Sequence, residues 1–125
     1  MRSGLAILLW AAGPDAQHLC ATPFLHAAAA AAMDIDVEIH CSGKSVLLLV
    51  PGAATSMYVG EQRDMSLYAH IRQAVRFGAK LYACSDALAT HGVHPTSLIP
   101  EVAGLAGAAT FVERVLDPAW VTLVY

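Results

Sequence analysis

Short apolar runs alternate with helix-forming segments along the whole chain, and this alternation restricts the fold more than any other feature. The apolar runs predict five strands, at residues 5–12, 36–41, 79–83, 101–103 and 120–125. The segments between them predict helices over residues 22–33, 66–77, 86–91 and 107–116. Strands separated by helices pair mainly in parallel and need helices over both faces of the sheet. We therefore expect an α/β fold with a mainly parallel five-stranded sheet, formed as a single domain over residues 1–125.

Two segments after the second predicted strand cannot be assigned to a helix or a strand from their residue pattern. The apolar run at residues 46–50 precedes Pro51-Gly52 and fits a strand or a buried helical turn equally well. Residues 51–65, with Tyr58 near the middle, form the longest stretch without a clear element. Long loops in compact domains often close over binding sites, so we expect residues 51–65 to be a lid or binding segment.

The composition is unusually apolar for a chain of this size. Hydrophobic residues make up 57% and charged residues 14% of the 125 positions, whereas soluble domains average about 45–50% and about 25%. So short a chain cannot bury all of this apolar surface within itself. We therefore expect a homo-oligomer, a trimer or hexamer rather than a monomer.

The charge distribution gives no support for a nucleic-acid partner. The chain has 7 Lys and Arg residues and a formal net charge of −3, with no basic run. Tight binding to a duplex needs a cluster of cations that neutralises phosphates. We therefore expect no direct contact with nucleic acid.

The first apolar run, which follows Arg2, resembles a short signal peptide. Its removal would delete the first predicted strand, so we expect it to remain in the folded protein. No segment approaches the roughly 20 apolar residues of a membrane-spanning helix, and we expect no membrane association. Cys20, Cys41 and Cys84 lack a CxxC pair and the dense spacing of a disulfide scaffold. These features predict reduced thiols in the cytoplasm.

Cys84 is the leading candidate for a functional residue. It closes the apolar run Leu81-Tyr82-Ala83 and is followed by Ser85-Asp86, a helix-start signal. A thiol there would lie at the carboxyl end of a strand and the amino end of a helix, where the dipole favours thiolate. Ligands of parallel sheets bind beyond this edge. The alternative reading, an inert packed cysteine, stays open because free cysteines are often buried.

Other candidates lie on segments expected to reach the same edge. The binding candidates are Gly13, Asp15, Cys20, Tyr58, Ser85 and Glu101. Cys20 would serve as a second acceptor thiol or pack in the core, and Glu101 would accept a proton from Cys84 or face solvent as an edge carboxylate. Cys41 ends a strand and is expected to be structural.

The sequence gives little support for a metal site. His91 and His94 are three residues apart, but Gly92 breaks the helix that would align them, and the acidic partner of a catalytic zinc motif is missing. A composite site that adds His40, Cys41 and Cys84 is the alternative. We expect no metal and no cofactor.

Several segments resemble one family in their order and spacing. They are Gly13-Pro14, Thr22-Pro23-Phe24, Val37-Glu38-Ile39, Ser42-Gly43, Gly78 to Ser85, Leu98 to Val102 and Gly107 to Phe111. Together these segments resemble the DsrE/DsrF-like family of sulfur-relay proteins. The resemblance implies a flavodoxin-like three-layer sandwich, assembly into dimers, trimers or hexamers, and a short helix after Gly43 that includes residues 46–50. It also implies that Cys84 matches the cysteine that carries sulfur as a persulfide.

Two functional hypotheses follow. In the first, the protein is a sulfur carrier of the sulfurtransferase type, which receives sulfane sulfur on Cys84 from a donor protein and passes it to an acceptor protein, with residues 51–65 closing the cleft. In the second, it is a non-catalytic small-ligand-binding or assembly module of the same fold, in which Cys84 is structural. Reaction of Cys84 with a small alkylating reagent distinguishes the two.

Overall fold

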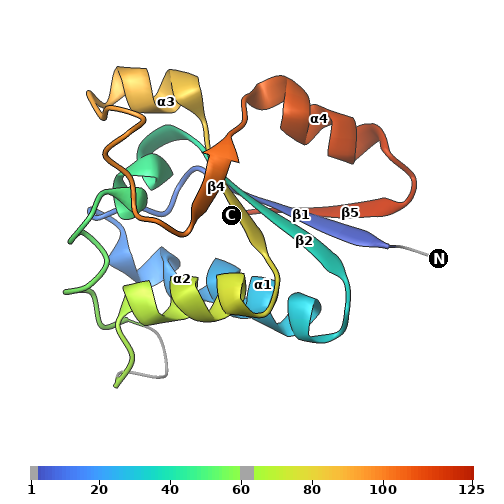
Figure 1. The fold of residues 1–125 in the computed structure, drawn as a ribbon, viewed down its shortest axis with the longest axis horizontal. Helices are drawn as coiled ribbons and strands as arrows, with labels where there is room; N and C mark the ends of the chain where they lie inside the picture. Colours follow the sequence, from blue (N-terminus) through green and yellow to red (C-terminus); the bar gives the residue numbers. More distant parts are fainter. Residues whose placement is uncertain (1–2, 60–63) are drawn as a thin grey trace.

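The computed structural model describes residues 3–59 and 64–125, which form a five-stranded, all-parallel sheet (Figure 1). The strands are β1 (Gly4–Leu9), β2 (Asp36–Cys41), β3 (Lys80–Ala83), β4 (Val102–Leu105) and β5 (Trp120–Val124). Their order across the sheet is β4-β3-β2-β1-β5. The chain therefore builds the sheet outward from β1 to β4, then returns to place β5 on the free side of β1. The predicted α/β fold class is confirmed.

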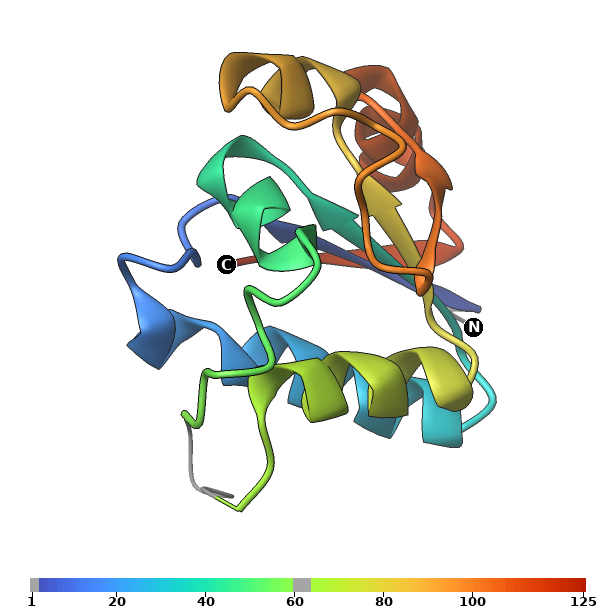
Figure 2. The same cartoon turned by 60° about the vertical axis from the view of Figure 1, so that its left-hand side comes forward.

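Helices cover both faces of the sheet and give three layers (Figures 1 and 2). The helices are α1 (Ala21–Ala32), α2 (Leu67–Arg76), α3 (Ser85–Thr90) and α4 (Ala108–Leu116), with 3₁₀ turns η1 (Gln17–Leu19) and η2 (Gly43–Leu49). Helices α1 and α2 pack together on one face, and α4 covers the other. Helix α3 lies on the same side as α4 and packs against η2.

The α1 and α2 side holds the main core. Ile7, Ile39 and Leu81 point to this face from neighbouring strands, and Phe24 and Ile71 meet them from the two helices; all five are fully buried. Five alanines of α1 are also buried, at positions 21, 27, 28, 30 and 31, and their small side chains allow close packing. This face is therefore filled with side chains.

The predicted elements match the observed ones to within a few residues, except at the first strand. That strand ends at Leu9 rather than at residue 12, because the chain turns at Trp10, whose side chain is 58% exposed. Residues 46–50 lie mostly in η2, as the family resemblance implied. In the segment 51–65, residues 51–56 form turns and Tyr58 is exposed; Gly60 to Arg63 lie outside the described residues.

The polar side of β2 differs from expectation. Its alternation of polar and apolar residues predicts one face exposed to water. In the structure only Asp36 is exposed, whereas Glu38 and His40 are 9% and 4% exposed. These two side chains are buried because α4 lies over them and supplies Arg114 as a partner.

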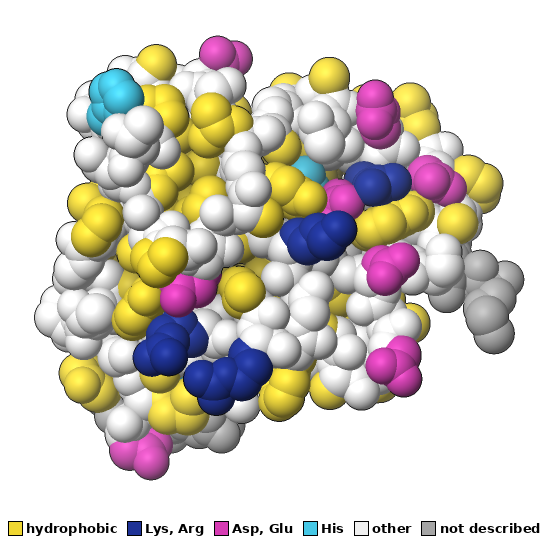
Figure 3. All heavy atoms as spheres, in the orientation of Figure 1, with side chains coloured by type: hydrophobic (Ala, Val, Ile, Leu, Met, Phe, Trp, Pro, Cys, Tyr) yellow, Lys and Arg dark blue, Asp and Glu magenta, His cyan; other side chains and the backbone are white. Residues whose placement is uncertain are grey.

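The last third of the chain leaves much apolar surface uncovered. No residue of α4 is fully buried, and Val112, Val115 and Leu116 form an exposed apolar stripe at helical spacing. The edge strand β5 exposes Val121, Leu123 and Val124. Figure 3 shows apolar side chains interspersed with charged groups over α4 and β5. We call the stripe on α4 formed by Val112, Val115 and Leu116 the α4 stripe.

Candidate functional site

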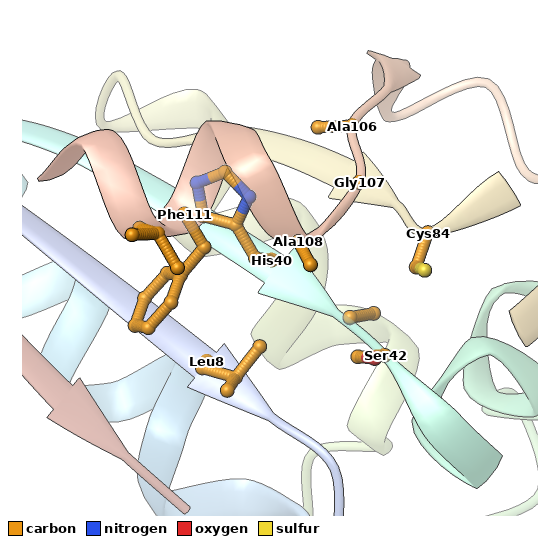
Figure 4. Close-up of a pocket in the computed structure, with 10 residues that line it drawn as sticks. Leu8, His40, Ser42, Cys84, Ala106, Gly107, Ala108 and Phe111 are labelled. Carbon is orange, nitrogen blue, oxygen red and sulfur yellow. The ribbon is translucent and has the colours of Figure 1, made fainter. Parts of the chain in front are cut away.

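A cavity of about 260 Å³ lies at the carboxyl ends of the strands, between the sheet and the amino end of α4 (Figure 4). Its lining residues come from the ends of β1, β2 and β3, the turn after β4 and the first turns of α4. They are Leu8, His40, Cys41, Ser42, Cys84, Ala106, Gly107, Ala108, Phe111 and Val112. Two of these residues carry reactive or titratable groups that reach the cavity from the α4 side of the sheet: Cys84 and His40.

Cys84 is the first residue after β3 and the N-cap of α3. Its backbone N–H donates to the Cys41 carbonyl at 2.9 Å, which fixes it beside the end of β2. Its side chain makes no capping hydrogen bond and is only partly buried. The thiol is therefore held by backbone contacts, while its sulfur lines the cavity.

The other two cysteines are fully buried. The Sγ of Cys20 lies 3.5 Å from the Gly13 carbonyl and 3.6 Å from the Ala16 carbonyl, and burial raises the pKa of this thiol. Burial raises the pKa of Cys41 to about 12. Both remain protonated thiols at neutral pH. All three cysteines lie in the described part of the chain, and Cys84 is the one with solvent access.

His40 belongs to a buried row of charged and polar groups beneath α4. Arg114 donates from Nε to Glu38 Oε1 at 3.1 Å and from Nη2 to Glu38 Oε2 at 2.8 Å. The same Oε1 lies 3.1 Å from His40 Nε2. Burial alone would raise the pKa of Glu38, but the hydrogen bonds from Arg114 and His40 outweigh it and the pKa is lowered. Glu38 is therefore an ionised carboxylate at neutral pH.

The imidazole of His40 is also held by its neighbours. It stacks on Tyr82 with ring centroids 5.4 Å apart and meets the edge of Phe111 at 5.5 Å. Burial lowers the pKa of His40, an effect that Glu38 offsets only in part. The ring is therefore neutral near pH 7, oriented by Glu38 and fixed between two aromatic side chains.

Sequence reasoning did not single out Glu38, His40 and Arg114 as a group. The available signal was the Glu38-Ile39-His40 alternation in a strand expected to be covered on both faces, together with one Arg on a mainly apolar helix. A polar face on such a strand needs a buried partner.

The predicted catalytic residue Cys84 lines this cavity, and Ser85 follows it directly in the chain. The other predicted binding residues are not among the residues that line the cavity. Gly13 lies in the turn after β1, and Asp15 is exposed and pairs with Lys44 at 3.2 Å. Tyr58 is 54% exposed. Ser85 begins α3 next to Cys84 but is itself exposed.

Glu101 takes a different role from the one expected. It precedes β4, at the amino end of that strand, whereas Cys84 follows the carboxyl end of β3. Its Oε1 accepts a hydrogen bond from the Tyr68 hydroxyl at 2.8 Å, and Arg72 approaches its other oxygen at 4.0 Å. Glu101 thus ties β4 to α2 and is not among the residues that line the cavity.

No cluster of three or more His, Cys, Asp or Glu side chains suited to a metal ion occurs among residues 3–59 and 64–125. His91 and His94 are exposed, and His94 Nδ1 accepts from the Thr96 backbone at 3.2 Å. The composite metal site considered from the sequence is therefore not formed in this part of the chain. Within the same residues, no helix is long and apolar enough to cross a membrane.

The fold and the site define a class: small, all-parallel, three-layer α/β proteins with a cysteine where a central strand meets a helix. The model of the DsrE/DsrF-like family matches residues 6–122, and the chain belongs to this family.

Two solved structures share the fold over their whole length and over the whole of this chain. The ychN protein from E. coli superposes with a TM-score of 0.77 at 13% identity. The protein of unknown function MTH1491 from Methanobacterium thermoautotrophicum superposes with a TM-score of 0.68 at 14% identity. At these identities the likeness concerns the fold, and it agrees with the flavodoxin-like sandwich expected from the family. No curated protein sequence matches the chain.

Proposed function

We propose that the protein is a sulfur carrier, which holds sulfane sulfur as a persulfide on Cys84 and passes it to a partner protein. The observation that carries the proposal is the difference between the three cysteines. Cys84 lines the cavity, is partly exposed and makes no side-chain hydrogen bond, whereas Cys20 and Cys41 are fully buried, although Cys41 also borders the cavity. Membership of the DsrE/DsrF-like family supports this choice.

The proposed chemistry consists of two sulfur exchanges. The Cys84 thiolate attacks the outer sulfur of a donor persulfide, the donor S–S bond breaks, and its electron pair leaves on the donor's inner sulfur as a thiolate. An acceptor thiolate then attacks the outer sulfur on Cys84, and the electron pair of that S–S bond returns to Cys84 Sγ. The exchanges involve no net oxidation or reduction and need no cofactor. A reducing cytoplasm would keep Cys84 free for the reaction.

The apolar walls suit the intermediate. Five lining residues are aliphatic or aromatic: Leu8, Ala106, Ala108, Phe111 and Val112. A terminal sulfur on Cys84 would lie among them and be partly shielded from water and from competing thiols.

Intact-mass analysis after incubation with inorganic polysulfide tests the proposal. We expect addition of one sulfur atom, reversed by dithiothreitol and mapped to Cys84 by peptide analysis. Cys84→Ser should abolish the addition, because it removes the nucleophile with little change in size. Cys20→Ala serves as the matched control and should still be loaded. Loading on a different cysteine, or none on the wild-type protein, would contradict the carrier role.

We further propose that the protein works as a homo-oligomer, a trimer or hexamer. The α4 stripe and the exposed apolar residues of β5 support this, because groups of exposed apolar side chains often mark a protein–protein interface. The low net charge and apolar composition favour a second copy of the chain as the partner that covers these exposed apolar residues.

A further inference from the structure

The two edges of the sheet differ in how well they are protected against pairing with another chain. The edge strand β4 has four residues, contains Gly104 and pairs with β3 through a register shift between Leu81 and Tyr82. Short and irregular edge strands, like Lys or Pro within an edge, hinder edge-to-edge association. The edge strand β5 has none of these features: its five residues pair with β1 in an unbroken register, and none is charged. The outer edge of β5 is therefore suited to pair with another strand.

The backbone hydrogen bonds at the end of β5 show which of its groups face outward. Tyr125, just after the strand, donates from its N–H to a β1 carbonyl at 2.8 Å and accepts from the first residue after β1 at 3.1 Å. Both backbone groups of a residue in a parallel strand point to one side, and the side alternates along the strand. Val121 and Leu123 therefore face β1, whereas the N–H and C=O groups of Thr122 and Val124 face outward. No strand within residues 3–59 and 64–125 pairs with this outer side.

The side chains of β5 suit a second copy of the same strand. An edge that pairs with itself about a two-fold axis does so antiparallel. With the axis at Thr122, the middle residue, Val121 lies opposite Leu123 of the second copy, and Trp120 lies opposite Val124 of the second copy. Val121, Leu123 and Val124 are exposed in the single chain, so the pairing covers apolar surface. Thr–Thr and aromatic–β-branched pairs are favourable across strands, and no like charges meet.

We propose that β5 pairs antiparallel with β5 of a second copy of the chain, with Thr122 of each copy opposite the other, so that the two sheets become one continuous sheet. The inference rests on the homo-oligomer proposed above and specifies one of its contacts. A two-fold contact joins copies in pairs, so it fits a hexamer and excludes a trimer. The α4 stripe remains available for contacts between the pairs.

Hydrogen exchange at single amides of the wild-type protein tests the pairing. The amides of Thr122 and Val124 should exchange as slowly as those of Val121 and Leu123, because all four would be bonded between strands. Without the pairing, the two outward amides should exchange fast while the two inward amides stay protected by β1. Fast exchange at Thr122 and Val124 in an oligomer overturns the pairing and leaves the oligomer itself standing.

A proline variant supplies the second measurement. Thr122→Pro removes an outward N–H and keeps the inward hydrogen bonds to β1, so the mass measured by light scattering should fall by half. Leu105→Pro makes the same change at an outward position of β4, since the next residue, Ala106, donates to β3. This control should keep the wild-type mass.

Equal masses for Thr122→Pro and the wild type overturn the proposal. A wild-type trimer or monomer, or protection of Thr122 by a different co-purifying protein, overturns it as well. Of these results, only the monomer also contradicts the proposed homo-oligomer. Sulfur loading of Cys84 is measured separately by mass, so the carrier role and the β5 pairing can fail independently.

Discussion

His70 is a second buried histidine, and its environment differs from that of His40. It lies in α2, is 1% exposed, and neither ring nitrogen has a partner within the described residues. Burial lowers its pKa, and the charge of Asp64 offsets this only in part. The folded protein therefore takes up a proton at His70 only at a lower pH than the unfolded chain does.

This difference predicts that the folded state loses stability in mild acid. The unfolded chain binds the proton first as pH falls through the ordinary histidine value of about 6.5, so the free energy of unfolding decreases below that pH. Above that pH the histidine is neutral in both states, and its contribution to the free energy of unfolding is fully present. Urea unfolding at several pH values between about 5 and 8 should show the decrease, and His70→Leu should reduce its slope. His91→Gln, at an exposed position, should keep the wild-type slope.

Gly4 is required by the packing of Trp120 rather than by its backbone angles. A Cβ at position 4 would lie 2.3 Å from the Trp120 ring, whereas a Cβ at Gly104 would meet Tyr82 at 3.9 Å. Gly4→Ala should therefore destabilise the protein by about 1–3 kcal/mol, the usual cost of overpacking. Urea unfolding measures the change, with Gly104→Ala as the matched strand glycine. Similar losses in both variants would show that steric conflict at Trp120 is not the cause.

At the level of elements, α4 is attached to the sheet by a polar contact as much as by apolar packing. Arg114 makes two hydrogen bonds to Glu38, and its guanidinium also lies 4.0 Å above the Trp120 ring. Arg114→Leu removes these contacts and leaves the buried carboxylate of Glu38 without its guanidinium partner.

We expect Arg114→Leu to lower the free energy of unfolding by about 1–3 kcal/mol at pH 7. Adding Glu38→Gln should recover part of the loss, because no buried negative charge then remains. Chemical denaturation of the two single variants and the double variant gives the coupling between them. A coupling near zero would mean that the two side chains contribute independently.

The elements themselves could be predicted because strand and helix signals are local. The run of residues 36–41 and the Gly78 stop after α2 are read from neighbouring residues. The partner of the polar Glu38 side chain on β2 could not be predicted from neighbouring residues. Arg114 is far along the chain, and its contact with Glu38 depends on how α4 crosses the sheet. The position of Cys84 was predicted for the same local reason, whereas the placement of Cys20, Tyr58 and Glu101 depended on tertiary packing.

For the whole molecule, the uncovered apolar surface predicts where copies of the chain meet. Leu116 in the α4 stripe is 77% exposed, and Met33 at the end of α1 is 68% exposed. If the α4 stripe is the contact, Leu116→Glu should lower the assembly mass measured by light scattering toward 13.1 kDa. Met33→Glu introduces the same charge elsewhere and should leave the mass unchanged. A wild-type mass of one chain at micromolar concentration would contradict the oligomer.

The accessibility of the thiols can be predicted in the same way. In the native protein iodoacetamide should modify Cys84 within the time that leaves Cys20 and Cys41 untouched, because both of these are fully buried. In denaturant all three should react. Mass mapping after a timed quench separates the sites, and a protected Cys84 in the native protein would favour the structural reading of this residue.

The pairing of β5 with β1 also has a consequence for biosynthesis. These strands are neighbours in the sheet, but they stand at opposite ends of the described chain. Strands β1 to β4 can pair as soon as residues up to 105 have left the ribosome, yet one edge of β1 stays open until residues 120–124 have also emerged. An open edge beside an apolar strand is a template for pairing with other chains. Ribosome-bound intermediates of this protein should therefore depend on chaperones until the last strand has docked.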